Sequence, residues 1–512
     1  MYQLGESLKN SSIFAQLRCF LSFIFLSLPR YKGKEMPMEK LIGRKNETDK
    51  LSSYMQSDRS EFIAIYGRRR VGKTFLVRSF FKDKFDFYAT GIIEGNKSEE
   101  MEAFHVALLK YGYVGPRAKT WIEAFMQLDD LLEKKNANKK KRLVVFIDEL
   151  PCFDTQNSGF VHALDFFWNS RGSWMDNIMF IICGSATSWM IRNVVNNRGG
   201  LHNRLTHEIH LTPFTLRQTE LYIRSKKVQW DRLSILQIYM VLGGIPYYLN
   251  MLDVTKSATE NIDMLFFSDE AKLKTEYNLL YQSLYRNPDE YMEVIDLLAT
   301  NKTGLTRKEI AENLKVHDNG HLGKILEDLV SCDFLRLYRN GTKQNSGIYQ
   351  LMDFYTMFYH QFGKRKTSDS HYWSSLTETP TQNTWYGLAY ERVCLYHFRQ
   401  IIYALRLDAI HTEFYSWRSR ESVPAAQIDM IIDRSDGIID LCEVKYSKNE
   451  YALAKSEYEK ILNREMAFNT ETKCKKGIHI VLVSTFGVKR NKYSSIAQHF
   501  ISLNDLFEDV YY

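Results

Sequence analysis

Residues 67–74, with the sequence GRRRVGKT, constrain the fold most, because they match the pattern G-x-x-x-x-G-K-[ST] at every fixed position. The apolar residues 62–66 predict a buried strand directly before them, and residues 74–81 predict a helix directly after them. Between such a strand and helix, a glycine-containing loop turns its backbone N–H groups toward an anion. We therefore expect a phosphate site made by Gly67, Arg68, Arg69, Arg70, Val71, Gly72, Lys73 and Thr74.

A second strand supplies the acidic residues that such a loop needs. Within the loop, Lys73 fits a contact with the β- and γ-phosphates, and the Thr74 hydroxyl fits a bond to Mg²⁺. Residues 143–147 are all apolar, as in a central parallel strand that is covered on both faces. Asp148 follows at the carboxyl end of this strand and is expected to hold Mg²⁺. Glu149 comes next and is expected to polarise the attacking water, which favours hydrolysis.

Polar residues after two further strands are candidates for the same site. Residues 178–183 predict a third buried strand with Ser185 at its tip. Ser185 either senses the γ-phosphate or orients the water, and the alternative is a helix N-cap formed by Ser185 or Thr187. Arg204 precedes a strand expected at residues 207–211. Because it lies nearer this strand than Arg198, Arg204 is the candidate charge stabiliser for the transferring phosphoryl group, and a solvated surface arginine is the alternative.

These motifs together resemble the archaeal-type AAA-like ATPases of the STAND-related group. The segments that carry the resemblance are 41–47, 67–74, 143–149, 184–186, 201–204 ahead of 212–214, and 243–246. The resemblance implies an α/β P-loop domain with a parallel sheet over residues 38–214, with ATP and Mg²⁺ as cofactors and ATP hydrolysis as the activity. The Gly-Gly-Ile-Pro segment at 243–246 is interpreted either as a hinge after this domain or as a simple turn.

Length and composition limit the remaining classes. A chain of 512 residues is too long for one core, and three domains are the natural expectation. The net charge of +7, with a pI near 8.7, is compatible with nucleic acid without being diagnostic of it. The basic run at 134–142 is interpreted as a solvated loop. The seven cysteines are scattered, without metal-binding spacing, which indicates a reduced, cytoplasmic protein.

The first residues need a separate interpretation. Residues 17–28 are largely apolar but are too few to span a bilayer, and no small-residue cleavage site follows them. We expect residues 1–37 to be an upstream extension, with Met36 or Met38 as the true start, and we expect no membrane partner.

The middle of the chain predicts two helical modules. Residues 215–285 suit a helical lid on the ATPase domain. Residues 286–365 predict a winged helix, with helices at 291–298, 306–312 and 322–330 and a hairpin formed by 334–338 and 347–351. Thr306 and Glu309 have the spacing of a capping box. The third helix offers Lys324 but also Glu327 and Asp328, so a coupling role and DNA readout are both left open.

The last part of the chain carries a second set of polar residues. Residues 427–433 and 438–445 predict a hairpin that brings Asp429 close to Glu443 and Lys445. Two carboxylates hold Mg²⁺, and a lysine activates water or stabilises a phosphate. This pattern resembles the restriction-endonuclease-like core over residues 380–512, in which Glu391 of an upstream helix would add a third acid. The alternative is a structural hairpin with a surface Glu443–Lys445 ion pair.

The sequence therefore predicts an α/β protein in which an Mg-ATP-hydrolysing switch is coupled to an Mg²⁺-dependent nuclease domain acting on DNA. In this hypothesis the catalytic residues are Glu149, Ser185, Arg204, Glu391, Asp429, Glu443 and Lys445, and the metal ligands are Thr74, Asp148, Asp429 and Glu443. One alternative is an ATPase whose C-terminal domain only binds nucleic acid or a protein partner. Another is a regulatory nucleotide-binding scaffold, which the acids at 148 and 149 disfavour. A second copy of the chain is a further possible partner.

Overall fold

The first sheet is built around β1 (Glu61–Tyr66), which confirms the strand predicted before the glycine-containing loop to within one residue. Five parallel strands follow the order β2-β3-β4-β1-β5. All six residues of β1 are buried, as expected for a strand with helices on both faces. The expected α/β class with a parallel sheet is therefore confirmed. The other strands are β2 (Phe87–Thr90), β3 (Leu143–Asp148), β4 (Ile178–Gly184) and β5 (His207–His210).

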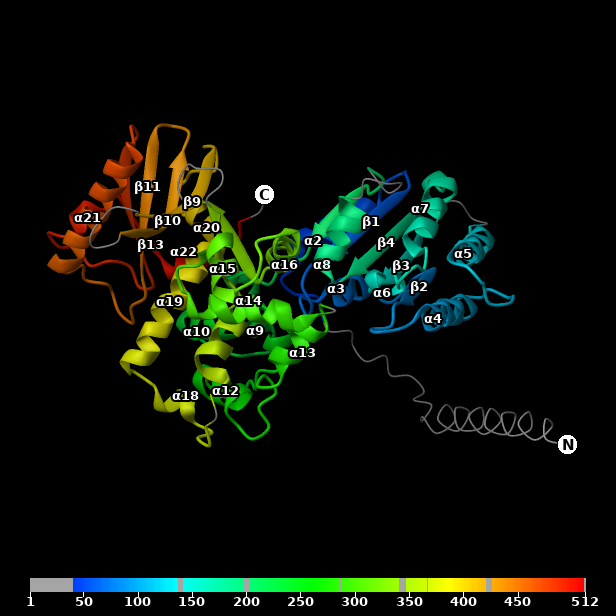
Figure 1. Cartoon of the computed structure of the whole chain (residues 1–512), viewed down its shortest axis with the longest axis horizontal. Helices are drawn as coiled ribbons and strands as arrows, with labels where there is room; N and C mark the ends of the chain where they lie inside the picture. Colours follow the sequence, from blue (N-terminus) through cyan, green and yellow to red (C-terminus); the bar gives the residue numbers. More distant parts are fainter. Residues whose placement is uncertain are drawn as a thin grey trace. The chain divides into compact units, whose positions relative to one another are not determined.

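Alternate residues of β1 enter two different cores. Phe62 and Ala64 pack with helices α4, α5 and α7, which Figure 1 shows grouped together in cyan and blue-green. Ile63 and Ile65 belong to a second core that continues into the helices after the sheet. The helices of this half are α2 (Lys45–Met55), α3 (Lys73–Phe81), α4 (Lys97–Lys110), α5 (Trp121–Lys135), α6 (Leu150–Phe153), α7 (Phe160–Ser170), η1 (Gly172–Trp174), α8 (Thr187–Met190) and η2 (Ile191–Val195).

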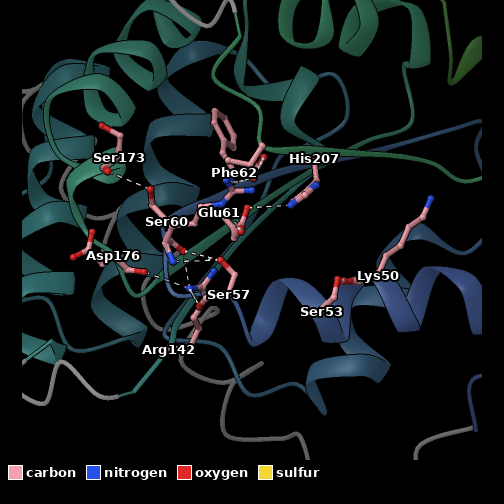
Figure 2. A network of polar contacts seen from close by, with 12 residues as sticks. Lys50, Ser53, Ser57, Ser60, Glu61, Phe62, Arg142, Ser173, Asp176 and His207 are labelled. Carbon is pink, nitrogen blue, oxygen red and sulfur yellow. Dashed lines mark hydrogen bonds and ion pairs between the residues drawn. The ribbon is translucent and has the colours of Figure 1, made fainter.

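Arg142 ties together the chain at the amino ends of these strands. Its Nη1 donates to the carbonyl oxygens of Ser57 at 2.8 Å and Arg59 at 2.7 Å. Figure 2 shows this network, in which the same nitrogen also lies 3.3 Å from the Asp176 carbonyl oxygen. Arg142, the last residue of the basic run, is therefore a structural residue, which corrects the interpretation of this residue as part of a solvated loop. Lys139 and Lys140 lie outside the described residues.

Five helices follow β5 where the helical lid was expected. Gly243 ends α10 with φ of 62°, and a side chain at Gly244 would approach the Phe214 carbonyl oxygen to 1.9 Å. The Gly-Gly-Ile-Pro segment therefore forms a tight turn in close backbone contact with residue 214. The five helices are α9 (Leu216–Ser225), α10 (Arg232–Leu242), α11 (Pro246–Leu249), α12 (Ala258–Phe266) and α13 (Glu276–Gln282).

A module of three helices and a small sheet comes next. The order of the sheet is β6-β8-β7, and both of its pairs are antiparallel. Thr306 and Glu309 form the capping box that their spacing predicts, at the start of α15. The elements are α14 (Pro288–Thr300), β6 (Leu305–Thr306), α15 (Arg307–Leu314), α16 (Gly320–Ser331), β7 (Leu335–Arg339) and β8 (Gly347–Leu351), followed by α17 (Phe354–Phe358), η3 (Tyr359–Gly363) and α18 (Tyr372–Ser375).

The C-terminal module has a mixed sheet in the order β13-β12-β11-β10-β9. The pairs β9–β10 and β10–β11 are antiparallel, whereas β11–β12 and β12–β13 are parallel. Figure 1 shows α21 along this sheet, where Ile461 and Phe468 enter its core. The elements are α19 (Pro380–Tyr396), α20 (Phe398–Ala404), β9 (Thr412–Arg418), β10 (Gln427–Arg434), β11 (Ile438–Lys445), α21 (Lys455–Thr472), β12 (Gly477–Ser484), η4 (Ser494–Ile496), β13 (His499–Ser502) and α22 (Leu503–Leu506).

The computed structural model describes residues 40–136, 141–196, 203–285, 287–339, 347–365, 367–419 and 426–510. The expected extension at 1–37 and the segment 198–202, with Arg198, lie outside these ranges. Within them, every helix is too short or too polar to cross a lipid bilayer. The six cysteines in these ranges are all free thiols.

Candidate nucleotide site and C-terminal acidic site

The glycine-containing loop lies between β1 and α3, as its sequence predicts. Gly67 has φ of 149°, and a side chain there would approach the Leu211 carbonyl oxygen to 2.2 Å, so only glycine fits. Gly72 has φ of 93° and open space around it. The buried Lys73 ammonium donates to the carbonyl oxygens of Gly67 at 2.7 Å and Arg68 at 3.0 Å. The lysine therefore lies along the loop, at the position from which it can contact a bound phosphate.

The expected magnesium ligands converge next to this lysine. Thr74 Oγ1 donates to Oδ2 of Asp148, the last residue of β3, at 2.7 Å. The other carboxylate oxygen accepts the Glu149 backbone N–H at 3.0 Å. Burial raises the pKa of Asp148, and the hydrogen bond from Thr74 opposes that rise. A hydroxyl and a carboxylate oxygen at the tip of a phosphate loop fit a hard cation such as Mg²⁺.

Ser185 contacts Glu149 directly. Its hydroxyl donates to Glu149 Oε1 at 2.7 Å, and its backbone N–H donates to Oε2 at 3.2 Å. The helix α8 begins after Ala186 without a side-chain cap, so neither Ser185 nor Thr187 caps it. Of the two interpretations of Ser185, the cap is therefore wrong. The serine instead fixes the carboxylate that we expect to polarise water.

Arg44, in the opening motif, supports the loop from outside. Its Nη2 donates to the carbonyl oxygens of Val71 at 3.0 Å and Thr212 at 2.9 Å. The guanidinium also stacks 4.5 Å from the centre of the Phe214 ring. Burial lowers the pKa of Arg44 to about 10, which still leaves it charged at neutral pH. The motif singled out at 41–47 thus carries a buried structural arginine.

Two of the loop arginines form ion pairs with distant carboxylates, which the sequence did not indicate. Arg68 Nη1 and Nη2 lie 3.0 and 3.2 Å from the two Asp353 carboxylate oxygens, 285 positions further along the chain. Arg70 pairs with Glu276 of α13, and the same carboxylate accepts the Tyr248 hydroxyl at 2.9 Å. These pairs connect the phosphate loop to α13 and to the segment after β8.

Arg204 lies far from the loop of its own chain. In the parallel pairing of β1 with β5, Ile63 is opposite His207 and Tyr66 is opposite His210. Arg204 precedes β5 and is exposed, so it lies at the amino ends of the strands, whereas the loop follows their carboxyl ends. At about 3.3 Å per residue, this separation is roughly 20 Å. Arg204 therefore does not approach the loop of its own chain, and a contact with the phosphates would need a second copy of the chain.

Glu100 of α4 is a buried carboxyl group near the site. It is fully buried, and its Oε1 accepts the Ile92 N–H at 2.9 Å, while Oε2 has no partner among the described residues. Burial raises the pKa of Glu100 from 4.5 to about 7. Between pH 4.5 and about pH 7, the Glu100 carboxyl group of the folded chain therefore keeps a proton that the unfolded chain has released.

We expect Glu100 to make the protein less stable as the pH rises. The contribution of the neutral carboxyl group is complete below about pH 4.5 and is lost as the pH rises through about 7. Glu100→Gln should remove this part of the pH dependence, as measured by the urea midpoint at pH 5 and pH 8. The exposed Glu102→Gln variant is the control. Equal pH slopes in wild type and Glu100→Gln would contradict the assignment.

In the C-terminal module, the hairpin brings the expected acids together. Met430 of β10 pairs with Cys442 of β11, so the next antiparallel step places Asp429 opposite Glu443. Gln427 Nε2 donates to Asp429 Oδ1 at 2.6 Å. Burial first, and then the negative charge of Asp429, raises the pKa of Glu391 to about 7. Asp429 and Glu443 therefore lie opposite each other, and the charges of both act on Glu391.

Glu443 is held by two cations. Lys445 Nζ lies 2.8 Å from one of its carboxylate oxygens, and Arg464 of α21 pairs with the other. Burial alone would raise the pKa of Glu443, but these two charges outweigh it and lower the pKa. Among the described residues, no three His, Cys, Asp or Glu side chains lie close enough together to hold a metal ion by themselves. A magnesium site here would use two carboxylates, with water and substrate oxygens as further ligands.

The helix α16, considered above for DNA readout, packs against the ATPase half. Asp328 pairs with Arg192 of η2 and also accepts the Tyr291 hydroxyl at 2.8 Å. Lys324 and Glu327 are exposed, so their charges offset each other at the surface. These contacts favour the coupling role over DNA readout for this helix.

The parallel sheet, the phosphate loop and the paired Thr74 and Asp148 define a P-loop ATPase domain. Residues 41–252 match the model of a family described as an ATPase domain predominantly from Archaea, so this part of the chain is an ATPase domain of the archaeal type. An uncharacterized protein of Methanocaldococcus jannaschii is 24% identical over 326 residues, which is 63% of this chain and 68% of that protein.

Some solved structures align with part of this chain. A Walker-type ATPase of Pyrococcus abyssi aligns with a TM-score of 0.44 and 18% identity, over 63% of this chain and 96% of that one. The ORC2 protein of Aeropyrum pernix, solved as ADPNP and ADP complexes, aligns with a TM-score of 0.41 and 16% identity. That alignment covers 62% of this chain and 91% of the Aeropyrum chain.

Proposed function

We propose that this chain is an Mg-ATP-hydrolysing switch that controls an Mg²⁺-dependent nuclease site in its C-terminal module, with DNA as the substrate. The observation that carries the nuclease part is the placement of Asp429 opposite Glu443, beside Lys445 and Glu391. The mixed sheet with a helix before it and a parallel crossover through α21 supports a restriction-endonuclease-like fold for residues 380–512.

The ATPase part rests on the residues around the phosphate loop. The backbone of residues 67–74 would bind the phosphates, and Thr74 with Asp148 would hold Mg²⁺, which neutralises phosphate charge when bound. Glu149, held by Ser185, would orient and polarise a water molecule. Each residue thus has a contact in the structure that suits its proposed role.

The module between the two sites is proposed to be a winged helix that transmits the state of the nucleotide. Its helices α14, α15 and α16 and the β6-β8-β7 sheet have the element order of that fold. Asp353 follows β8 and pairs with Arg68 of the phosphate loop. Gln350 of β8 accepts from Arg336, whose Nη2 donates to Ser416 of β9 at 3.2 Å. Short contacts therefore connect this module to both sites.

In the C-terminal site, this chain's residues would bind and position a phosphodiester. Asp429 and Glu443 would hold Mg²⁺, which supplies a Lewis acid when bound. The raised pKa of Lys445 keeps its ammonium group protonated. This charged group would move from Glu443 toward the attacking water or the charged phosphate. Burial alone would lower the pKa of Lys445, but the Glu443 carboxylate outweighs it.

The nuclease proposal is tested by Mg²⁺-dependent degradation of supercoiled and single-stranded DNA. We expect wild type to degrade DNA, and Glu443→Ala and Lys445→Ala to lose roughly 100-fold or more of that rate. Lys455→Ala removes an exposed lysine of the same module and is the matched control. Equal rates in wild type and both variants would contradict the assignment of these residues.

The second candidate is a C-terminal module that binds nucleic acid or a protein partner without cutting. The ion pairs of Glu443 with both Lys445 and Arg464 favour it, because a carboxylate that is already paired is a poorer metal ligand. ATP hydrolysis without DNA degradation under any condition would select this function.

The free thiols suit a reducing compartment such as the cytoplasm.

A further inference from the structure

The three arginines in the phosphate loop differ in their surroundings. Arg68 and Arg70 are each paired with a buried carboxylate, Asp353 and Glu276. Arg69 forms no hydrogen bond or ion pair with any residue that the structure describes. One arginine of the loop is therefore available for a ligand, and two are not.

Arg69 faces the same cavity as the candidate catalytic residues. A cavity of about 680 Å³ is lined by Arg69, Glu149, Cys152 and Ser185, together with residues from the β2–α4 loop and from the end of α13. Of its lining residues within the described ranges, only Arg69 is basic. Burial raises the pKa of Cys152 to about 12, and the charge of Arg69 opposes that rise. Because Arg69 and Glu149 line the same cavity, Arg69 lies on the Glu149 side of the loop.

The cavity lies on the side of the loop toward which the terminal phosphate of a bound triphosphate would point. It opens at the carboxyl ends of β3 and β4, where Glu149 and Ser185 follow the two strands. In open α/β sheets, ligands bind at these ends. A phosphate held by the loop backbone with its magnesium at Thr74 and Asp148 would direct its terminal group toward Glu149. That is the side on which Arg69 lies.

We propose that Arg69 is a catalytic residue that contacts the terminal phosphate of ATP from within the same chain and stabilises the charge that develops there. Arg204, expected in this role from the sequence, lies at the opposite ends of the strands. The assignment rests on the proposed ATPase function. In the hydrolytic step, water oxygen bonds to the γ-phosphorus as the bond to the β–γ bridging oxygen breaks, and the water proton leaves toward Glu149. Arg69 donates hydrogen bonds throughout and exchanges no proton.

The proposal predicts a specific kinetic pattern for substitutions at this residue. Arg69→Ala should lower kcat for ATP roughly 100-fold or more, because a guanidinium on the transferring group acts mainly in the transition state. ADP lacks the terminal phosphate, so its affinity should stay within about 3-fold of wild type. Arg69→Lys should recover part of kcat, since the charge returns without the planar fork.

The measurements are kcat and KM for ATP, and equilibrium affinities for ADP and the non-hydrolysable analogue ADPNP. Arg117→Ala, which removes an arginine paired only with Glu102 at the surface, is the control. An unchanged kcat in Arg69→Ala, or a parallel loss of ADP affinity, would overturn the proposal. If wild type binds ADPNP but hydrolyses no ATP, the proposed function fails separately. Arg69 is then judged by whether its removal lowers ADPNP affinity relative to ADP affinity.

Discussion

Replacing Lys73 with alanine is expected to reduce ATP turnover by roughly 100-fold or more. The Lys73 ammonium is buried in the loop and contacts the Gly67 and Arg68 carbonyl oxygens, within reach of a bound phosphate. Burial lowers the pKa of this lysine, because the charged form has lost water contacts. Contact with phosphate would compensate for that loss, so the substitution should also weaken nucleotide binding.

The fold should tolerate this substitution. Removing a buried charge whose partners are only backbone carbonyl groups relieves desolvation, so we expect no large fall in the free energy of unfolding. Steady-state ATP hydrolysis and the urea midpoint are measured together, with Lys84→Ala as the exposed-lysine control. If Lys73→Ala turned over ATP at the wild-type rate, the nucleotide site described here would be wrong.

The second large effect is expected from Asp353. Its ion pair with Arg68 is 2–3% exposed and bidentate. Burial alone would lower the pKa of Arg68, but the Asp353 carboxylate outweighs it and raises the pKa. Asp353→Ala would leave the guanidinium buried without its counter-charge. We expect a loss of about 3–5 kcal/mol in the free energy of unfolding, from urea denaturation.

A double variant separates the lost pair from a damaged core. Arg68→Met with Asp353→Leu replaces both charges by apolar groups of similar volume, and buried pairs replaced in this way often cost little stability. We therefore expect the double variant to be more stable than Asp353→Ala. The same two changes should uncouple the loop from the segment after β8. A double variant as unstable as Asp353→Ala would show that the packing at this position matters more than the charge pair.

Local patterns predicted much of the nucleotide site. The strand, loop and helix around residues 67–74 are contiguous, so their spacing alone fixes how they fold. Asp148 and Glu149 follow a wholly apolar run, which identifies the carboxyl end of a buried parallel strand. Thr74 and Asp148 are 74 positions apart, yet both were assigned because each lies at a predictable end of its element.

The contacts that the sequence did not predict have different physical reasons. The Arg68–Asp353 pair joins residues 285 positions apart, and no periodicity marks either one. The place of Arg204 within its own chain had an available signal, because a residue that precedes a parallel strand lies at the edge opposite to a loop that follows one. Arg142 was interpreted as solvated because charge runs usually are, but three carbonyl groups converge on it.

In the proposed function, the state of the nucleotide site controls the C-terminal acidic site. The most direct test is the rate of supercoiled DNA degradation in Mg²⁺, with and without ATP, for wild type and Lys73→Ala. We expect ATP to change the wild-type rate and to leave the Lys73→Ala rate at its value without ATP. An identical ATP response in the two proteins would contradict control of the C-terminal acidic site by the nucleotide site.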